Sequence, residues 1–200
     1  MRKSTIKLTK KEFDFISSKE YPITKRAVIQ KFCQRFDEMG MLFRQKLVSK
    51  NIKLSAELAE ADFKTTRGEN YQSLPYVVLD YPKIKEKEFT LLCRTHFWWG
   101  KYISLSVMFK ADEFELKNFA NKLKNSIYKK IKLYNGKDIW QQDLSDTHFI
   151  KLYKFSEAEL YATMQTQLYV KLSVKVSFKN LDELEERAVA FYNEILNTFE

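Results

Sequence analysis

The chain has few residues of the kinds that build phosphate-binding loops, metal centres and disulfide frameworks. Its 200 residues include four glycines, two cysteines and two histidines. Glycine-rich loops cradle phosphates through closely approaching backbone N–H groups, and four scattered glycines form no such loop. The cysteines form no CxxC pair, and a site built on both histidines would need carboxylates that no motif supplies. The sequence therefore predicts no cofactor and no metal.

Long apolar runs are also lacking, which bears on the expected location. No uninterrupted apolar stretch approaches the roughly 18 residues that a membrane span needs. The basic N-terminus is not followed by the apolar segment of a secretory signal. Cys33 and Cys93 are expected to be reduced thiols, at a helical position and in a buried strand. We therefore expect a cytoplasmic protein with no membrane partner.

Aromatic residues and positive charge are plentiful. Hydrophobic residues make up 44% of the chain and aromatic residues 15%, enough for the core of one domain over residues 1–200. The net charge of +9 lies in residues 1–53, which hold 14 Lys/Arg and 5 Asp/Glu, while residues 54–200 hold 21 of each. Such a segment suits nucleic acid or an acidic partner, or it is simply a well-solvated helical surface.

Residues 1–63 are expected to be helical. A capping box of Thr9 and Glu12 predicts a short helix over 10–17 that buries Phe13 and Ile16. The Glu-Tyr-Pro stretch that follows should end this helix, because the residue before a proline is pushed out of the helical region.

Steps of three and four between apolar residues predict a longer helix over 24–48. Gly40 either divides this helix or allows close packing. A further short helix is expected over 55–63.

Residues 64–200 are expected to form a sheet and its covering helices. Alternation of apolar and polar residues is clearest over 168–178, and Gly100 suits a hairpin turn. Strands are expected at 76–80, 88–98, 101–109, 131–134, 137–140 and 168–178, with a polar loop over 141–147. Helices are expected at 112–127, at 156–162, where Ser156 and Glu159 form a capping box, and at 180–196, where Asn180 is the cap. The fold class is thus α+β, a mostly antiparallel or mixed sheet of about five to six strands with helices on one face.

A ligand site is predicted on the polar face of this sheet. Strand alternation places Arg94, His96 and Trp98 on one face, which continues onto the polar face of the next strand. The candidate ligand-binding residues there are Arg94, His96, Trp98, Tyr102, Lys171 and Lys175. Cations and aromatic rings could hold an anionic molecule, since guanidinium groups fork onto phosphate and rings stack on bases. The alternative is that these side chains merely solvate the face, or that other helices cover it.

A second candidate is the polar segment 66–75, expected to be a loop between the helical part and the sheet. Loops held between rigid elements often carry function. In this segment Arg67 offers a charge and Asn70 an amide, so both are candidate ligand-binding residues. No nucleophile motif, P-loop or HExxH accompanies them.

The predicted function is a non-enzymatic ligand-binding or interaction domain. One alternative is nucleic-acid binding through the basic N-terminal quarter, and another is an enzyme with an unrecognised site near His96.

The segments GENYQSLPYVVLDYP and FTLLCRTHFWWGKYISLSV, within residues 67–109, resemble a bacterial family of similar length with no known activity. The resemblance implies a bacterial cytosolic protein and transfers no catalytic or binding residue.

Overall fold

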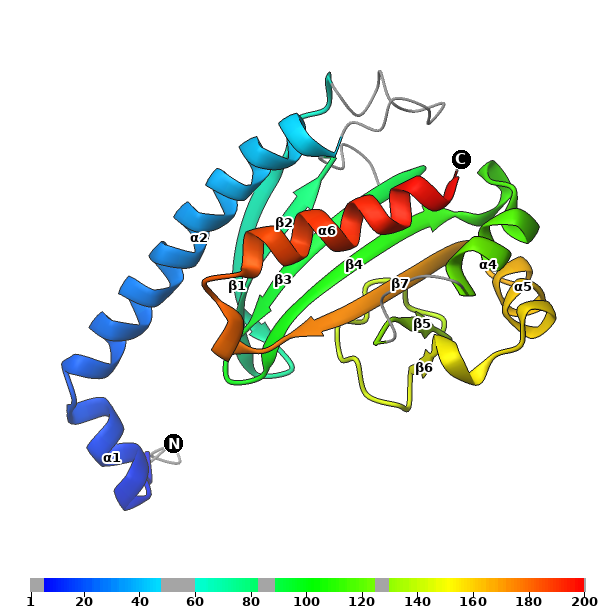
Figure 1. Ribbon diagram of the computed structural model, residues 1–200. Helices are drawn as coiled ribbons and strands as arrows, with labels where there is room; N and C mark the ends of the chain where they lie inside the picture. Colours follow the sequence, from blue (N-terminus) through cyan, green and yellow to red (C-terminus); the bar gives the residue numbers. More distant parts are fainter. Residues whose placement is uncertain (1–5, 48–59, 83–88, 125–129, 200) are drawn as a thin grey trace.

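The computed structural model describes residues 6–47, 60–82, 89–124 and 130–199. These residues form an α+β structure with one sheet, in which every paired strand is antiparallel (Figure 1). The strand order is β1-β2-β3-β4-β7-β5-β6. The strands are β1 (Lys64–Tyr71), β2 (Leu74–Tyr81), β3 (Leu91–Trp98), β4 (Tyr102–Lys110), β5 (Lys132–Tyr134), β6 (Phe149–Lys151) and β7 (Tyr169–Val176). The helices are α1 (Lys10–Ser17), α2 (Glu20–Lys46), α4 (Leu116–Lys124), α5 (Glu157–Gln165) and α6 (Leu184–Leu196).

The predicted class is confirmed, but the predicted count of five to six strands is wrong, because the sheet has seven. Strand β1 covers most of the segment expected to be a loop. Among the described strands it pairs with β2 alone, and an edge strand does not need the apolar alternation that reveals a strand in sequence. Residues 137–140 are not a strand, and β5 pairs instead with β6, where Leu133 lies opposite Ile150.

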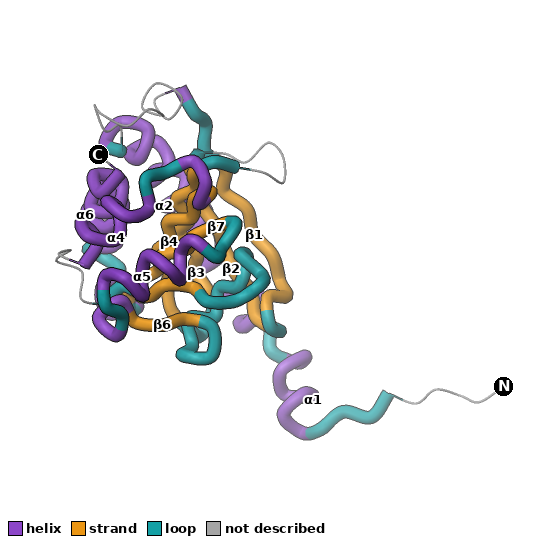
Figure 2. Tube along the Cα trace, turned by 90° about the vertical axis from the view of Figure 1, so that its right-hand side faces the viewer, coloured by secondary structure: helices purple, strands orange, loops and turns teal. Residues whose placement is uncertain are grey.

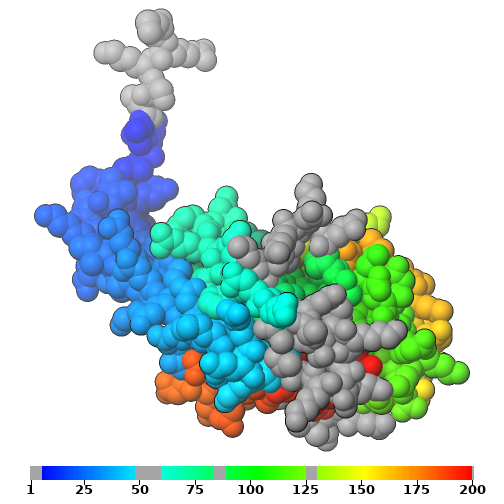
Figure 3. All heavy atoms as spheres, turned by 90° about the horizontal axis from the view of Figure 1, so that it is seen from above, coloured from blue at the N-terminus to red at the C-terminus, as the bar shows by residue number. Residues whose placement is uncertain are grey.

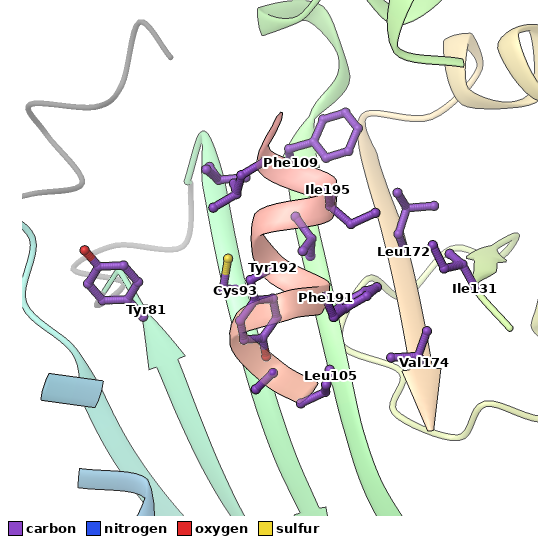
Figure 4. Close-up of a cluster of buried hydrophobic side chains, with 14 of the residues drawn as sticks. Tyr81, Cys93, Leu105, Phe109, Ile131, Leu172, Val174, Phe191, Tyr192 and Ile195 are labelled. Carbon is purple, nitrogen blue, oxygen red and sulfur yellow. The ribbon is translucent and has the colours of Figure 1, made fainter. Parts of the chain in front are cut away.

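One face of the sheet carries the main hydrophobic core. Helices α2, α4, α5 and α6 contribute to the same buried cluster as the inward residues of β2, β3, β4 and β7. Figure 2 shows α4 and α6 on one side of the strands, and Figure 4 shows α6 over β3 and β4, with β7 alongside. Tyr192 of α6 is wholly buried there, and its hydroxyl lies 2.9 Å from the Thr95 hydroxyl of β3.

Helix α2 follows the predicted apolar stripe. Phe36, Met39 and Phe43 have no exposed surface. Gly40 allows close packing, because a Cβ there would meet the Phe63 ring at 2.3 Å, and α2 is not divided at this point.

The predicted capping boxes at Thr9 and Ser156 are both present, each with its glutamate three residues on. The hairpin turn is also confirmed, since Gly100 has a φ of 69°. The last helix begins at Leu184 instead of next to Asn180, because a 3₁₀ turn over Phe178–Asn180 comes first.

Helix α4 begins at Leu116, later than expected. The expected helix over 55–63 lies largely outside the described residues, as do residues 125–127 of the helix expected over 112–127. In the described part of the chain, no helix is long and apolar enough to cross a membrane.

Candidate functional site

The sheet face opposite the helices, here called the second face, carries the predicted candidate residues. Arg94, His96 and Trp98 of β3 lie opposite Ser106, Ser104 and Tyr102 of β4, respectively. Strand β7 extends the face, because Ser104 pairs with Lys175 and Met108 with Lys171. Partners in antiparallel strands share a face, so the predicted grouping of these six residues is confirmed.

This face is covered by residues 135–148, the segment between β5 and β6, here called the covering segment. The Lys171 ammonium donates to the carbonyls of Ile139 (2.9 Å) and Gln141 (2.5 Å). The Tyr102 hydroxyl donates to the Gln142 carbonyl and accepts from the Leu144 N–H. Side chains of the sheet thus bond to the backbone of an irregular segment. They satisfy carbonyl and N–H groups of that segment that make no hydrogen bonds between strands.

Further contacts tie the same segment to its surroundings. The Tyr71 hydroxyl accepts from the Gln142 N–H at 2.7 Å, and the Lys132 ammonium donates to the Leu144 carbonyl at 2.7 Å. Leu144 also packs in a small hydrophobic cluster with Tyr134 and Phe149. The covering segment is therefore anchored from several strands.

Most of the second face is not solvated, and an irregular segment covers it instead of the helices that were considered as an alternative. Ser104, Ser106 and Lys171 have no exposed surface, and His96 is 1% exposed. Trp98 is 1% exposed as well, while Tyr102 is half-buried and Lys175 is exposed. Polar alternation in a strand indicates which side chains share a face, but here the protein's own chain occupies that face.

Arg94 is neutralised within the fold. Its guanidinium makes two hydrogen bonds to the Asp80 carboxylate of β2, at 2.6 and 2.8 Å, and stacks 4.6 Å from the centre of the Trp140 ring. Both side chains of the ion pair are largely buried. The guanidinium group that was predicted to bind an anionic ligand is thus already engaged in a bidentate contact with Asp80.

Burial shifts the pKa values of His96 and Lys171 on the second face toward the uncharged forms. Burial lowers the pKa of His96 to about 3, and the nearby charges of Arg94 and Lys171 act in the same direction. Burial also lowers the pKa of Lys171 well below its ordinary value, with Arg94 contributing. A charged group loses hydration when it is buried, so the uncharged form is preferred.

Three polar atoms of this region have no hydrogen-bond partner in the described residues: His96 Nδ1, Ser104 Oγ and Gln142 Oε1. His96 and Ser104 are direct cross-strand partners. Buried polar atoms of this kind are costly unless a water or ligand satisfies them.

Arg67 and Asn70 are not brought to this region. Arg67 lies opposite Val77, whose side chain belongs to the core on the helical face, and its charge acts on the Cys33 thiol of α2. Asn70 is exposed, and its side-chain oxygen accepts from the Ser73 N–H. The structure thus does not join these two residues to His96.

A second region of interest is the N-terminal arm, defined here as residues 6–24, where a short helix packed on the core was predicted. Helix α1 has no buried residue, and the arm stands away from the body of the protein (Figures 1 and 3). The predicted burial of Phe13 and Ile16 is wrong, because they are 59% and 69% exposed. The first ion pair between α2 and the sheet follows the arm, between Lys25 and Glu69.

Apolar side chains are concentrated in this arm. Of the twelve exposed large hydrophobic residues in the described chain, seven lie in it. They are Ile6, Leu8, Phe13, Phe15, Ile16, Tyr21 and Ile23. Scattered exposed apolar residues are ordinary, but a grouping of this kind is typical of a surface that binds a partner. In the sequence, the short helix with its apolar residues was the feature that could have indicated this surface.

Comparisons with known proteins give little further information. No protein-family model matches the chain, and no curated protein matches it. Among solved structures, the chain is similar to a conserved hypothetical protein from Pyrococcus furiosus at 11% identity, over 84% of this chain and 98% of that one. The TM-score is 0.43, and at this level the likeness supports no functional argument.

Proposed function

We propose that the protein is a non-enzymatic interaction domain that contacts its partner through the N-terminal arm. The observation that carries this proposal is the exposure of seven large apolar side chains on one projecting element. Fully burying a side chain such as Phe or Ile is worth about 1.5–3 kcal/mol, so covering even part of the arm favours association. The capping box at Thr9 supports α1 without help from tertiary contacts.

The second face supports a binding role better than a catalytic one. Arg94, Lys171 and Tyr102 hold the fold's own groups, and neither Arg67 nor Asn70 is brought to His96. Catalysis of this kind requires a nucleophile and a base within reach of each other and of a substrate, and these residues do not provide such a pair.

The test measures association of the full chain in three assays: with itself by sedimentation velocity, with anionic lipid vesicles, and with a random single-stranded RNA at low salt. Each assay compares the wild type with the double variant Phe13→Asp, Ile16→Asp. Tyr153→Asp is the matched control, because Tyr153 is 62% exposed but lies outside the arm.

The proposal predicts association in at least one assay, lost in the arm variant and kept in the control. A wild type that associates in none of the three, or an arm variant that associates like the wild type, contradicts it.

A second candidate function is binding of a small anion beneath the covering segment. It is favoured by the unpaired atoms of His96 and Ser104, which share their sheet face with the Arg94 guanidinium and the Lys171 amino group. Titration with inorganic phosphate, followed by chemical shifts of the His96 ring, tests it. Unchanged shifts at millimolar phosphate would exclude it.

A further inference from the structure

The shielding of His96 from water depends on the covering segment. His96 is 1% exposed, and its ring lies against the rings of Tyr71 and Tyr76, at 5.6 and 5.7 Å between ring centres. The Tyr71 hydroxyl in turn donates to Gln141 Oε1 and accepts from the Gln142 N–H, both in the covering segment. His96 is therefore shielded by a ring that the covering segment holds in place.

Positive charges act on His96 from the strands of the second face. Burial lowers the pKa of His96, and the charges of Arg94 in β3 and Lys171 in β7 lower it further. The Asp80 carboxylate of β2 is already engaged by Arg94, and Glu69 of β1 is ion-paired with a lysine of α2. Asp80 and Glu69 are the only acidic residues in the described strands β1, β2, β3, β4 and β7. These strands therefore offer a protonated His96 no free carboxylate.

The three acidic residues of the covering segment have partners of their own. Asp138 and Asp143 each accept from a backbone N–H two residues later in the segment, at 3.0 and 3.2 Å. Asp146 is ion-paired with Lys132 of β5 at 2.8 Å. None of the three is thus a free counter-charge for His96.

The unpaired oxygens of this region are neutral. Two of them are buried without a hydrogen-bond partner among the described residues, Ser104 Oγ on the cross-strand partner of His96 and Gln142 Oε1 in the covering segment. The Nδ1 atom of His96 is unpaired in the same way. A neutral oxygen can accept a hydrogen bond, but it does not replace the hydration that a buried cation loses. The closed face therefore disfavours the protonated form of His96.

The covering segment is the part of this enclosure that should open most readily. Residues 135–148 contain no helix or strand, and their bonds to the sheet come from side chains such as those of Lys171, Tyr102 and Tyr71. Strand β3, by contrast, is paired on both sides, with β2 and with β4. Segments with few backbone hydrogen bonds open at a lower free energy than strands inside a sheet.

We propose that protonation of His96 opens the covering segment, so that residues 135–148 form a pH-dependent cover of the second face. In the open form the ring is hydrated and regains its ordinary pKa of 6.5, whereas the closed form has to release the proton. Acid thus favours the open form, and between pH 7 and pH 5 the ratio of open to closed molecules should rise about 25-fold. This inference goes beyond the proposed function, because it does not involve the arm.

The experiment is amide hydrogen exchange of the full chain, followed by mass spectrometry at pH 7 and pH 5 and corrected for the intrinsic pH dependence of exchange. The opening of the covering segment should increase about 25-fold at the lower pH. Because a local opening exposes little surface, this exchange should hardly change in urea below the unfolding transition. Exchange in β3 and β4 should be slower and should rise steeply with urea.

Two histidine variants assign the pH dependence to one residue. His96→Gln removes the titrating group, so exchange in the covering segment should be nearly equal at the two pH values. His148→Gln is the matched control, because His148 is the other histidine of the chain and the last residue of the covering segment, and it should show the wild-type increase. Urea denaturation verifies that both variants are folded, and His96→Asn is a second neutral replacement.

Three outcomes would overturn the inference. The first is exchange in the covering segment that does not rise between pH 7 and pH 5. The second is an equal rise in His96→Gln, which would assign the pH dependence to another group such as Lys171. The third is exchange that follows the urea dependence of β3 and β4, because the covering segment would then open only with the whole fold. The association assays on the arm are separate, so none of these outcomes contradicts the proposed function.

Discussion

The N-terminal arm and the second face of the sheet differ in what their side chains contact. The arm contains helix α1 and has its apolar residues in solvent, whereas Lys171, His96 and Ser104 of the second face have almost no exposed surface. The difference arises because the covering segment makes hydrogen bonds to the polar side chains of the second face. In the described chain, no segment buries a residue of α1. Exposure is thus decided by which other segment is available, as well as by the polarity of the residues themselves.

The comparison leads to a clear division of effects. Substitutions on the second face should reduce the stability of the fold, because they leave buried groups unpaired. Substitutions in the arm should leave the fold intact and change association only.

The largest effect is expected at Lys171. Replacing it with Ala removes a buried side chain and leaves the Ile139 and Gln141 carbonyls without their donor. We expect the free energy of unfolding to fall by about 3 kcal/mol or more, measured by urea denaturation. Lys179→Ala, at an exposed position, is the control and should change it by less than about 0.5 kcal/mol. A loss under about 1 kcal/mol at Lys171 would mean that the covering segment is weakly held.

The next effect is a dependence of stability on pH that comes from His96. Its pKa in the folded protein is about 3, below the ordinary 6.5, so the unfolded chain binds the proton more readily between these values. The contribution is therefore fully present above pH 6.5 and is lost as the pH falls. Between pH 7 and pH 5 the free energy of unfolding should decrease by about 2 kcal/mol.

Denaturation at both pH values checks this prediction with two variants. His96→Gln should remove this part of the pH dependence, while His148→Gln, at the other histidine, should keep it. An equal pH dependence in the His96 variant and the wild type would show that the fold does not lower the pKa of His96.

A smaller effect is expected from Tyr102→Phe. The variant loses the hydroxyl that bonds to the Gln142 carbonyl and the Leu144 N–H, which should cost about 1–1.5 kcal/mol. Hydrogen exchange should become about tenfold faster in the covering segment and stay unchanged in β3 and β4. Tyr153→Phe, at an exposed tyrosine, should change neither region. Equal acceleration in the strands would indicate that the segment and the sheet open together.

The smallest effect on stability is expected in the arm. Phe13→Asp with Ile16→Asp should change the free energy of unfolding by less than about 0.5 kcal/mol, because both side chains are already in solvent. The measurement needs a protein concentration too low for self-association, since a dimer would add its own stability. A loss above about 1 kcal/mol would mean that the arm packs on its own body in solution.

Much of the fold could be predicted from residue patterns. The apolar stripe of α2, the alternation in β7 and the two capping boxes depend on neighbours within a few residues, and all three are confirmed. Strand β1 escaped prediction because an edge strand carries polar residues on both faces. Strand β6 has only three residues, too few to show a period.

For the candidate site, the sequence predicted which residues share a sheet face, but it did not predict what those residues contact. Alternation placed Arg94, His96 and Trp98 together, and the register of the sheet confirms it. The pairing of Arg94 with Asp80 and the bonds of Lys171 to the covering segment could not be predicted, since their partners lie 14 and about 30 residues away.

By itself, the sequence determined the helices and strands with a clear period, the faces that their side chains share, and the positive charge of the first quarter. Only the tertiary structure decided that the polar sheet face is closed and that the apolar side of α1 is open. The reason is physical: periodicity follows from local backbone geometry, whereas burial depends on which distant segment packs against a face.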